Sequence, residues 1–190
     1  MQKVMILDNY DSFTYNLVHL VEKILHARVD VFYNDEVDIE KAKKYDKIIL
    51  SPGPGLPDEA GDMKKLIAAL APTHPLLGVC LGHQALGEYL GARLKNLPKV
   101  YHGCASPLTI KASHAKLFKN IPNGIMVGRY HSWVIDTELL PESFEVTATD
   151  HEGNIMAIAH RTLNITGVQF HPESIMTPYG EKLISNWLFD

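Results

Sequence analysis

The segment that decides the fold is residues 75–88, PLLGVCLGHQALGE, which reads as a buried strand, a sharp turn and the start of a helix. Its thiol, Cys80, lies on the turn, with Gly78 two residues before it and Gly82 two residues after it. Small residues at these two positions let the strand and helix backbones approach each other while the residue between them takes a strained conformation. The pattern therefore predicts a nucleophile elbow with Cys80 as its reactive group.

The turn alone leaves two interpretations of Cys80 open. A helix N-terminus carries partial positive charge, which stabilises a thiolate relative to a thiol. A free cysteine is also commonly a small buried hydrophobic residue of the core. Because a nucleophile needs a base to activate it, the choice depends on whether the rest of the chain supplies one.

The candidate base is His171, in the stretch GVQFHPES at residues 167–174, which follows a strand-like run at 165–170. Pro172 favours an extended conformation for His171. Side chains two residues apart in an extended segment point to the same side, about 6.6 Å apart along the chain. Glu173 can therefore hold one ring nitrogen of His171 and leave the other for the thiol.

The alternative interpretation of residues 171–174 is the N-terminal region of the last helix. Two observations together favour catalysis. The cysteine elbow and the histidine each follow a strand, and the carboxyl ends of parallel strands gather at one edge of a sheet. The sequence thus predicts a triad of Cys80, His171 and Glu173.

Composition limits the classes of protein to consider. The chain has 190 residues, of which 46% are hydrophobic, which suits one compact domain over residues 1–190. A net charge of −4 without a long basic block argues against nucleic acid or a membrane surface as the main partner. No run approaches the roughly 18 apolar residues of a membrane span. Two cysteines without a C-x-x-C pair, and a start unlike a signal peptide, lead us to expect a cytoplasmic protein without a disulfide framework.

The order of elements predicts an α/β fold. In the first half, strands are expected at 3–7, 29–33, 47–50 and 75–79, and helices from Ser12 or Thr14 to about 26, at 62–70 and from the elbow to about 90. This alternation predicts a mostly parallel central sheet flanked by helices. Shorter strands at 105–110, 124–130, 144–149 and 155–160 predict a smaller mixed or antiparallel region in the C-terminal half, and a helix is expected at 180–188.

The loop SPGPGLP at residues 51–57 directly follows the third predicted strand. It lacks the patterns of a phosphate-binding loop. Its prolines stiffen the backbone and its glycines let the backbone approach a ligand. One of its N–H groups, together with the N–H of Leu81, would form an oxyanion hole beside Cys80. As a lone feature, such a loop is more often an ordinary turn.

Four motifs in order resemble those of the class I (triad) glutamine amidotransferases: DNYDSFTYNL at 8–17, SPGPG at 51–55, GVCLGHQ at 78–84 and QFHPE at 169–173. More narrowly, the chain resembles, over essentially its full length, the glutaminase subunits of anthranilate synthase and of aminodeoxychorismate synthase. The resemblance implies that Cys80, His171 and Glu173 form the triad. It also implies that the backbone amides of Gly53 and Leu81 hold the oxyanion, and that the substrate pocket contains Gly55, Gln84, Ser132 and Trp133.

The resemblance further implies a substrate and a partner. The chain would hydrolyse glutamine and deliver ammonia to a chorismate-binding synthase subunit, with no cofactor and no metal on this chain. The motif at 8–17 and the loop at 51–57 favour the anthranilate (tryptophan) branch over the aminodeoxychorismate (folate) branch, and one chain can serve both. Two positions depart from the pattern. Cys104 stands where such subunits commonly have Lys, which puts a local contact in doubt, and Trp133 replaces a common Leu.

Three other interpretations use the same residues. A cysteine peptidase of related fold would keep the cysteine and histidine but would need no pocket at Gln84. A non-catalytic binding subunit would be expected to lack a member of the triad, and none is missing. A metal site at Cys80 and His83 would need further nearby ligands, which the sequence does not provide.

Overall fold

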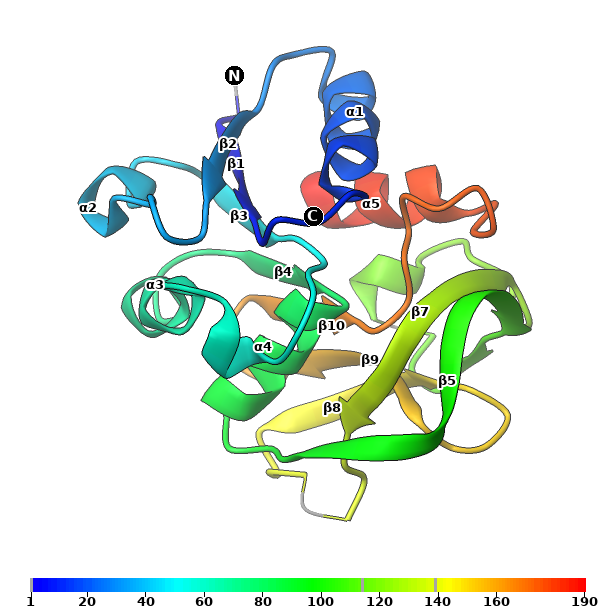
Figure 1. The fold of residues 1–190 in the computed structure, drawn as a ribbon. Helices are drawn as coiled ribbons and strands as arrows, with labels where there is room; N and C mark the ends of the chain where they lie inside the picture. The colour runs from blue at the N-terminus through cyan, green and yellow to red at the C-terminus, as the bar shows by residue number, and fades with distance from the viewer. Residues whose placement is uncertain (1, 114, 139) are drawn as a thin grey trace.

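The computed structural model describes residues 2–113, 115–138 and 140–190, which form an eight-stranded sheet with helices on both faces (Figure 1). The strand order is β2-β1-β3-β4-β10-β9-β8-β6. Five strands are parallel: β1 (Val4–Asp8), β2 (Asp30–Tyr33), β3 (Lys47–Leu50), β4 (Leu76–Val79) and β10 (Ile165–Val168). The antiparallel strands are β9 (Ile155–His160), β8 (Phe144–Thr149) and β6 (Thr109–Ile110). The prediction of an α/β fold with a mostly parallel sheet is confirmed.

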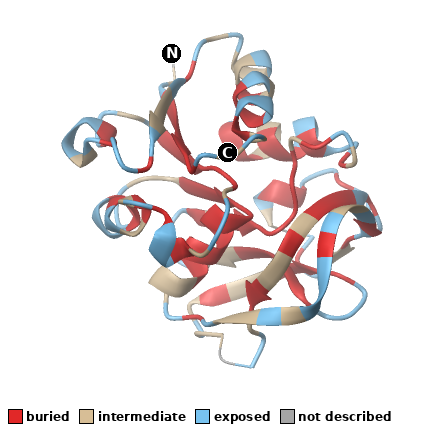
Figure 2. Cartoon of the chain, viewed as in Figure 1, coloured by how far each residue is buried: buried red, intermediate tan, exposed pale blue. Residues whose placement is uncertain are grey.

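Helices cover the two faces of the sheet in separate groups (Figure 1). One face carries α1 (Thr14–Leu25) and α5 (Gly180–Leu188), and the other carries α2 (Ile39–Ala42), α3 (Met63–Leu70) and α4 (Leu81–Tyr89). Two short 3₁₀ helices, η1 (Pro57–Glu59) and η2 (Lys116–Phe118), lie in the connections. All residues of β1, β3 and β4 are buried (Figure 2), as expected for parallel strands covered on both faces.

Helix α1 begins in a way that the sequence did not indicate. Its N-cap residue is Phe13, and no side chain caps it, so the expected cap at Ser12 or Thr14 is wrong. The Thr14 hydroxyl instead donates a hydrogen bond to Oδ1 of Asp8, at 2.8 Å. That bond ties the start of the helix to the end of β1, which is the edge of the sheet where the site lies.

A second sheet pairs β5 (Leu94–Pro107) with β7 (Met126–Ile135) in antiparallel register with two irregularities. The sequence predicted only the end of β5. Its first half is largely exposed (Figure 2), contains Pro98 and shows no alternation of polar and apolar residues, so no strand pattern was visible. The long β7 continues past residue 130 and brings residues 130–133 to the predicted substrate pocket.

The turn between β4 and α4 is packed too tightly for any side chain on its two glycines. A Cβ atom on Gly78 would lie 2.5 Å from the carbonyl carbon of Gly82, and a Cβ on Gly82 would overlap the carbonyl oxygen of Leu50 on β3. Backbone atoms occupy both positions, so a substituted side chain could not be accommodated by a change of rotamer. The glycine requirement inferred from the sequence therefore has a direct steric cause.

We expect Gly82→Ala to lower the free energy of unfolding by about 2 kcal/mol or more, because the added methyl group must displace the β3 backbone. Urea denaturation measures this as a lower midpoint at an unchanged slope. The control is Gly153→Ala, where a Cβ meets nothing within 4 Å and only the left-handed backbone (φ +84°) is strained, at a cost of about 1 kcal/mol. Equal losses for the two variants would contradict the steric argument.

Candidate active site

Cys80 lies between β4 and α4 with φ 51° and ψ −101°, a conformation that residues with a side chain rarely adopt. Backbone hydrogen bonds hold it on both sides. Its N–H donates to the carbonyl of Val168 on β10 at 2.8 Å, and its carbonyl accepts from the N–H of Gln84 on α4 at 3.0 Å. The residue is 6% exposed. The neighbouring strand and the helix therefore fix the strained backbone that presents the thiol at the carboxyl edge of the sheet.

His171 and Glu173 follow β10, the strand next to β4, and their side chains meet. Nδ1 of His171 lies 2.6 Å from Oε1 of Glu173, and both side chains are buried, at 2% and 0% exposure. The backbone of His171 is also held, because its N–H donates to Gly128 and its carbonyl accepts from the Thr177 hydroxyl. This is the pairing that the two-residue spacing predicted.

Cys80 and Glu173 both act on the pKa of His171. Burial alone would lower the pKa of His171, but the charge of the Cys80 sulfur, hydrogen bonding to it and the Glu173 carboxylate raise that pKa well above its ordinary value. These interactions favour the charged form of the imidazole. Two aromatic rings screen it from water: Tyr130, with a centroid distance of 4.9 Å, and Phe13, at 5.6 Å.

Two glutamine amides connect the thiol to the wall of the pocket. Nε2 of Gln169, which is fully buried, donates to the Cys80 sulfur at 3.6 Å. Nε2 of Gln84 donates both to Oε1 of Gln169, at 3.2 Å, and to the carbonyl of Trp133, at 2.9 Å. No role for Gln169 was predicted from the sequence. The signal was present, because Gln169 precedes His171 by the same two residues that separate His171 from Glu173.

A cavity of about 210 Å³ opens beside Cys80. Every residue to which the resemblance assigned a role in holding the oxyanion or binding the substrate lines this cavity. Its lining consists of Gly53, Pro54, Gly55, Cys80, Leu81, Gln84, Val100 and residues 130–133. His171 and Glu173 are absent from this lining. The structure therefore brings the predicted residues together from four separate stretches of chain.

The loop at 51–57 is fixed by Asn9, at the end of β1. The side chain of Asn9 donates to the carbonyl of Ser51, and its backbone N–H donates to the Ser51 hydroxyl, both at 2.9 Å. A Cβ on Gly53 would lie 2.6 Å from Cβ of Asn9 and from Cδ2 of Leu81, so the Gly53 backbone packs directly against the elbow. The motif at 8–17 thus supports the loop that carries the proposed oxyanion donor.

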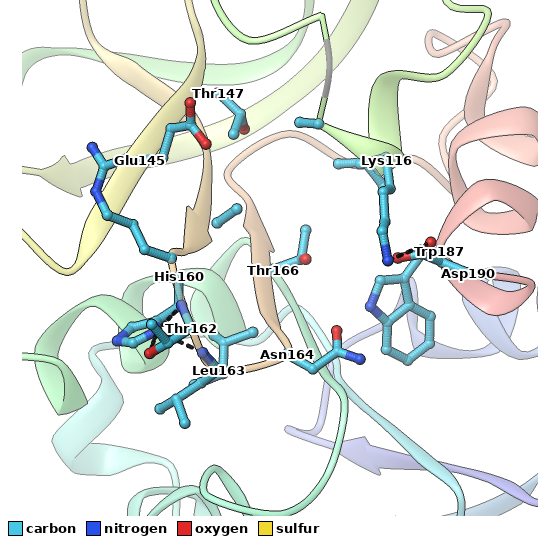
Figure 3. Close-up of a pocket in the computed structure, with 15 residues that line it drawn as sticks. Lys116, Glu145, Thr147, His160, Thr162, Leu163, Asn164, Thr166, Trp187 and Asp190 are labelled. Atoms are coloured by element: carbon cyan, nitrogen blue, oxygen red, sulfur yellow. Dashed lines mark hydrogen bonds and ion pairs between the residues drawn. The ribbon is translucent and has the colours of Figure 1, made fainter.

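A second cavity, of about 420 Å³, lies at the opposite edge of the sheet (Figure 3). Its lining includes Lys116 of η2, Thr147 of β8, Thr166 near the start of β10 and Trp187 of α5, and it contains no cysteine. Because Cys80 follows the carboxyl end of β4, the larger cavity is separated from the thiol by the length of the strands. The smaller cavity is therefore the candidate active site.

The remaining sequence features lie outside this arrangement. His83 is completely buried, and burial followed by the influence of His131 lowers its pKa to about 3, so it stays neutral. Among the described residues, no group of three or more His, Cys, Asp or Glu side chains could hold a metal ion. Cys104 lies on β5 opposite Arg129, beside an irregularity in the register, and does not line the cavity. No helix within the described residues is long and apolar enough to cross a membrane.

Comparison with known proteins identifies the family. The family model for class I glutamine amidotransferases matches residues 5–190, and the chain belongs to that family. It is 46% identical over 192 residues to anthranilate synthase component 2 of Pseudomonas aeruginosa, covering 97% of this chain and 94% of that protein. It is 44% identical over 187 residues to aminodeoxychorismate synthase component 2 of Klebsiella aerogenes, covering 97% of this chain and 98% of that protein.

A solved structure has the same fold. A Thermoplasma acidophilum protein, provisionally assigned as one subunit of GMP synthase, superposes with a TM-score of 0.89 and 26% identity, covering all of this chain and 93% of the other. The family membership and the enzyme class expected from the motifs are thereby confirmed.

Proposed function

We propose that this chain is the glutaminase subunit of a chorismate-using synthase, and that it hydrolyses glutamine with the triad Cys80, His171 and Glu173. The observation that carries the proposal is the arrangement at the ends of β4 and β10. A strained thiol there adjoins an imidazole whose pKa is raised, and a buried carboxylate lies 2.6 Å from that ring. Such an arrangement activates a cysteine for attack on an amide.

In the proposed reaction, the Cys80 sulfur attacks the carboxamide carbon of glutamine. Backbone N–H groups of Gly53 and Leu81 would hold the negative oxygen that develops. His171 gives its proton to the leaving nitrogen, the carbon–nitrogen bond breaks, and ammonia departs from a glutamyl thioester. Water, losing a proton to His171, then attacks the thioester and releases glutamate and the thiolate. Glu173 holds the ring throughout and stabilises its charged form.

The synthase partner is proposed from the relatives. Two proteins named as component 2 of chorismate-related synthases, one of anthranilate synthase and one of aminodeoxychorismate synthase, match nearly the whole chain. We favour ammonia delivery for anthranilate synthesis, hence the tryptophan branch. The folate branch is the second candidate, because the aminodeoxychorismate relative is almost as similar. A cytoplasmic heteromer without a resident cofactor is part of this proposal.

Reconstitution with a synthase subunit tests which acceptor receives the ammonia. The chain is combined with each chorismate-using synthase subunit of its source organism, with chorismate and glutamine supplied and products identified by mass. Anthranilate is the expected product. Aminodeoxychorismate from a different partner would replace the preferred branch, and both products would indicate a shared subunit. Peptide cleavage without any effect of glutamine would contradict the whole proposal and favour the peptidase alternative.

A further inference from the structure

A buried ionic network lies behind the wall of the active-site cavity, with Arg129 on β7 at its centre. The Arg129 side chain is completely buried, and its Nη1 lies 2.9 Å from Oδ2 of Asp150, in the turn between β8 and β9. Its guanidinium also lies over the ring of Tyr101 on β5, 3.5 Å from the centroid. The two-stranded sheet and a turn of the eight-stranded sheet therefore meet at this one side chain.

Asp150 is built to remain a carboxylate. Burial by itself raises the pKa of Asp150, but hydrogen bonds from Asn154 and the charge of Arg129 outweigh it, and the pKa is lowered. The Asn154 side chain donates to Oδ2 at 2.9 Å, and the backbone N–H groups of Glu152 and Asn154 donate to Oδ1. A buried ion pair with this many hydrogen bonds holds Arg129 in a single position.

Arg129 in turn dictates the state of His131, two residues along the same strand. Nε of Arg129 donates to Nε2 of His131 at 3.2 Å. A guanidinium has no acceptor and keeps its charge, so Nε2 of the imidazole must be the unprotonated nitrogen. Burial, followed by the charge of Arg129, lowers the pKa of His131 to about 3. The ring is thus neutral, with its single proton on Nδ1.

The Nδ1 proton of His131 forms a hydrogen bond at the wall of the substrate pocket. Nδ1 of His131 lies 3.1 Å from the carbonyl oxygen of Trp133, which also accepts the 2.9 Å hydrogen bond from Gln84. Both lone pairs of this carbonyl are therefore engaged. The second N–H of Gln84 is committed to Gln169, so the Gln84 amide is held in one orientation with its oxygen free of these two bonds. The other tautomer of His131 would turn a lone pair towards the Trp133 carbonyl and break the chain of bonds.

We propose that Asp150, Arg129 and His131 are positioning residues for glutamine binding. Asp150 and Arg129 hold His131 as the Nδ1–H tautomer, and this tautomer fixes the Trp133 carbonyl and the Gln84 amide, which line the pocket. The kinetic part of this inference rests on the proposed glutaminase function. The tautomer itself does not, because it follows from the hydrogen bonds alone.

The first test is NMR on the intact protein labelled with ¹⁵N at histidine, with His131→Gln used to assign the signal. The charged and titratable groups facing this ring are Arg129, Tyr101, Asp150, His83 and His171. We expect a neutral ring protonated at Nδ1 that does not titrate between pH 5 and 8. A charged ring, or a proton on Nε2, would overturn the proposal whether or not the protein is catalytically active.

The second test is Arg129→Lys, which keeps a positive charge beside Asp150 but removes the planar N–H donor to His131. We expect the KM for glutamine to rise roughly tenfold with a much smaller change in kcat, and the His131 ring to lose its fixed Nδ1–H tautomer, because the donor that binds Nε2 is gone. Lys47→Met is the control, because Lys47 is a buried cation at the other edge of the sheet that donates to the Trp187 carbonyl. Its KM should stay at the wild-type value.

The outcomes separate the two proposals. A wild-type KM in Arg129→Lys would refute the positioning role, and so would an unchanged Nδ1–H tautomer of His131 in that variant. Failure of the unmodified protein to hydrolyse glutamine, with or without a synthase subunit, would refute the proposed function and leave the NMR result to decide the network. If Arg129→Lys fails to fold, the tautomer measured in the unmodified protein still tests the inference.

Discussion

Cys80→Ala is expected to abolish glutamine-dependent synthesis while the synthase partner keeps its capacity to use free ammonia. The alanine side chain fits the space of the cysteine but cannot form a thioester, so glutamine hydrolysis should fall on the order of 10⁴-fold or more. The measurement compares product formation with glutamine and with ammonium in the reconstituted complex. Ammonium should restore the product, because in the proposed complex the acceptor site lies on the other chain.

The control for this variant is Cys104→Ala, which removes the other thiol of the chain. Because Cys104 lies outside the cavity, its loss should leave the glutamine-dependent rate close to that of the unmodified protein. Substantial glutamine hydrolysis by Cys80→Ala would show that another group attacks the amide. Loss of activity with both glutamine and ammonium would point instead to a failure of assembly.

Glu173→Gln is expected to lower kcat for glutamine hydrolysis by on the order of 10³–10⁴-fold. The Glu173 carboxylate accepts a hydrogen bond from Nδ1–H of His171 at 2.6 Å, and its side chain is completely buried. A glutamine of the same shape can present an N–H group there, which favours the His171 tautomer with its proton on Nε2. The ring could then no longer accept a proton from the thiol.

The measurement for Glu173→Gln is steady-state kinetics across pH, with KM reported separately from kcat. The carboxylate is one of the causes that raise the pKa of His171, so its removal should also shift the charged form of the ring to lower pH. Glu181→Gln, on the surface of α5, is the matched control and should change neither quantity. A loss below tenfold for Glu173→Gln would remove the carboxylate from the proposed mechanism.

Local sequence patterns predicted several elements whose apolar residues are mostly buried. The strands at 47–50, 144–149 and 155–160 and the helix at 180–188 occur at the predicted residues, because apolar runs bounded by turn residues leave little choice of structure. The first half of β5 was missed for the opposite reason. It is exposed, carries Pro98 and is a strand only because β7 pairs with it, and that pairing is a long-range property.

The site also has a part that local sequence predicts and a part that depends on long-range contacts. The spacing of His171 and Glu173 within an extended segment predicts their contact, since side chains two apart share a side. The pairing of Arg129 with Asp150 cannot be predicted in this manner, because the two residues come from different parts of the chain and no local pattern marks a buried ion pair. The proposed positioning of the pocket therefore depends on information that only the three-dimensional arrangement provides.

The proposed mechanism requires that Cys80 becomes covalently attached to the glutamyl group of glutamine. Rapid mixing with glutamine, acid quenching and mass spectrometry of peptides would detect the thioester directly. We expect a glutamyl adduct on the peptide containing Cys80, formed during turnover and absent from Cys80→Ala. Continued release of ammonia from glutamine without an adduct on that peptide, or with the adduct on Cys104, would contradict the mechanism.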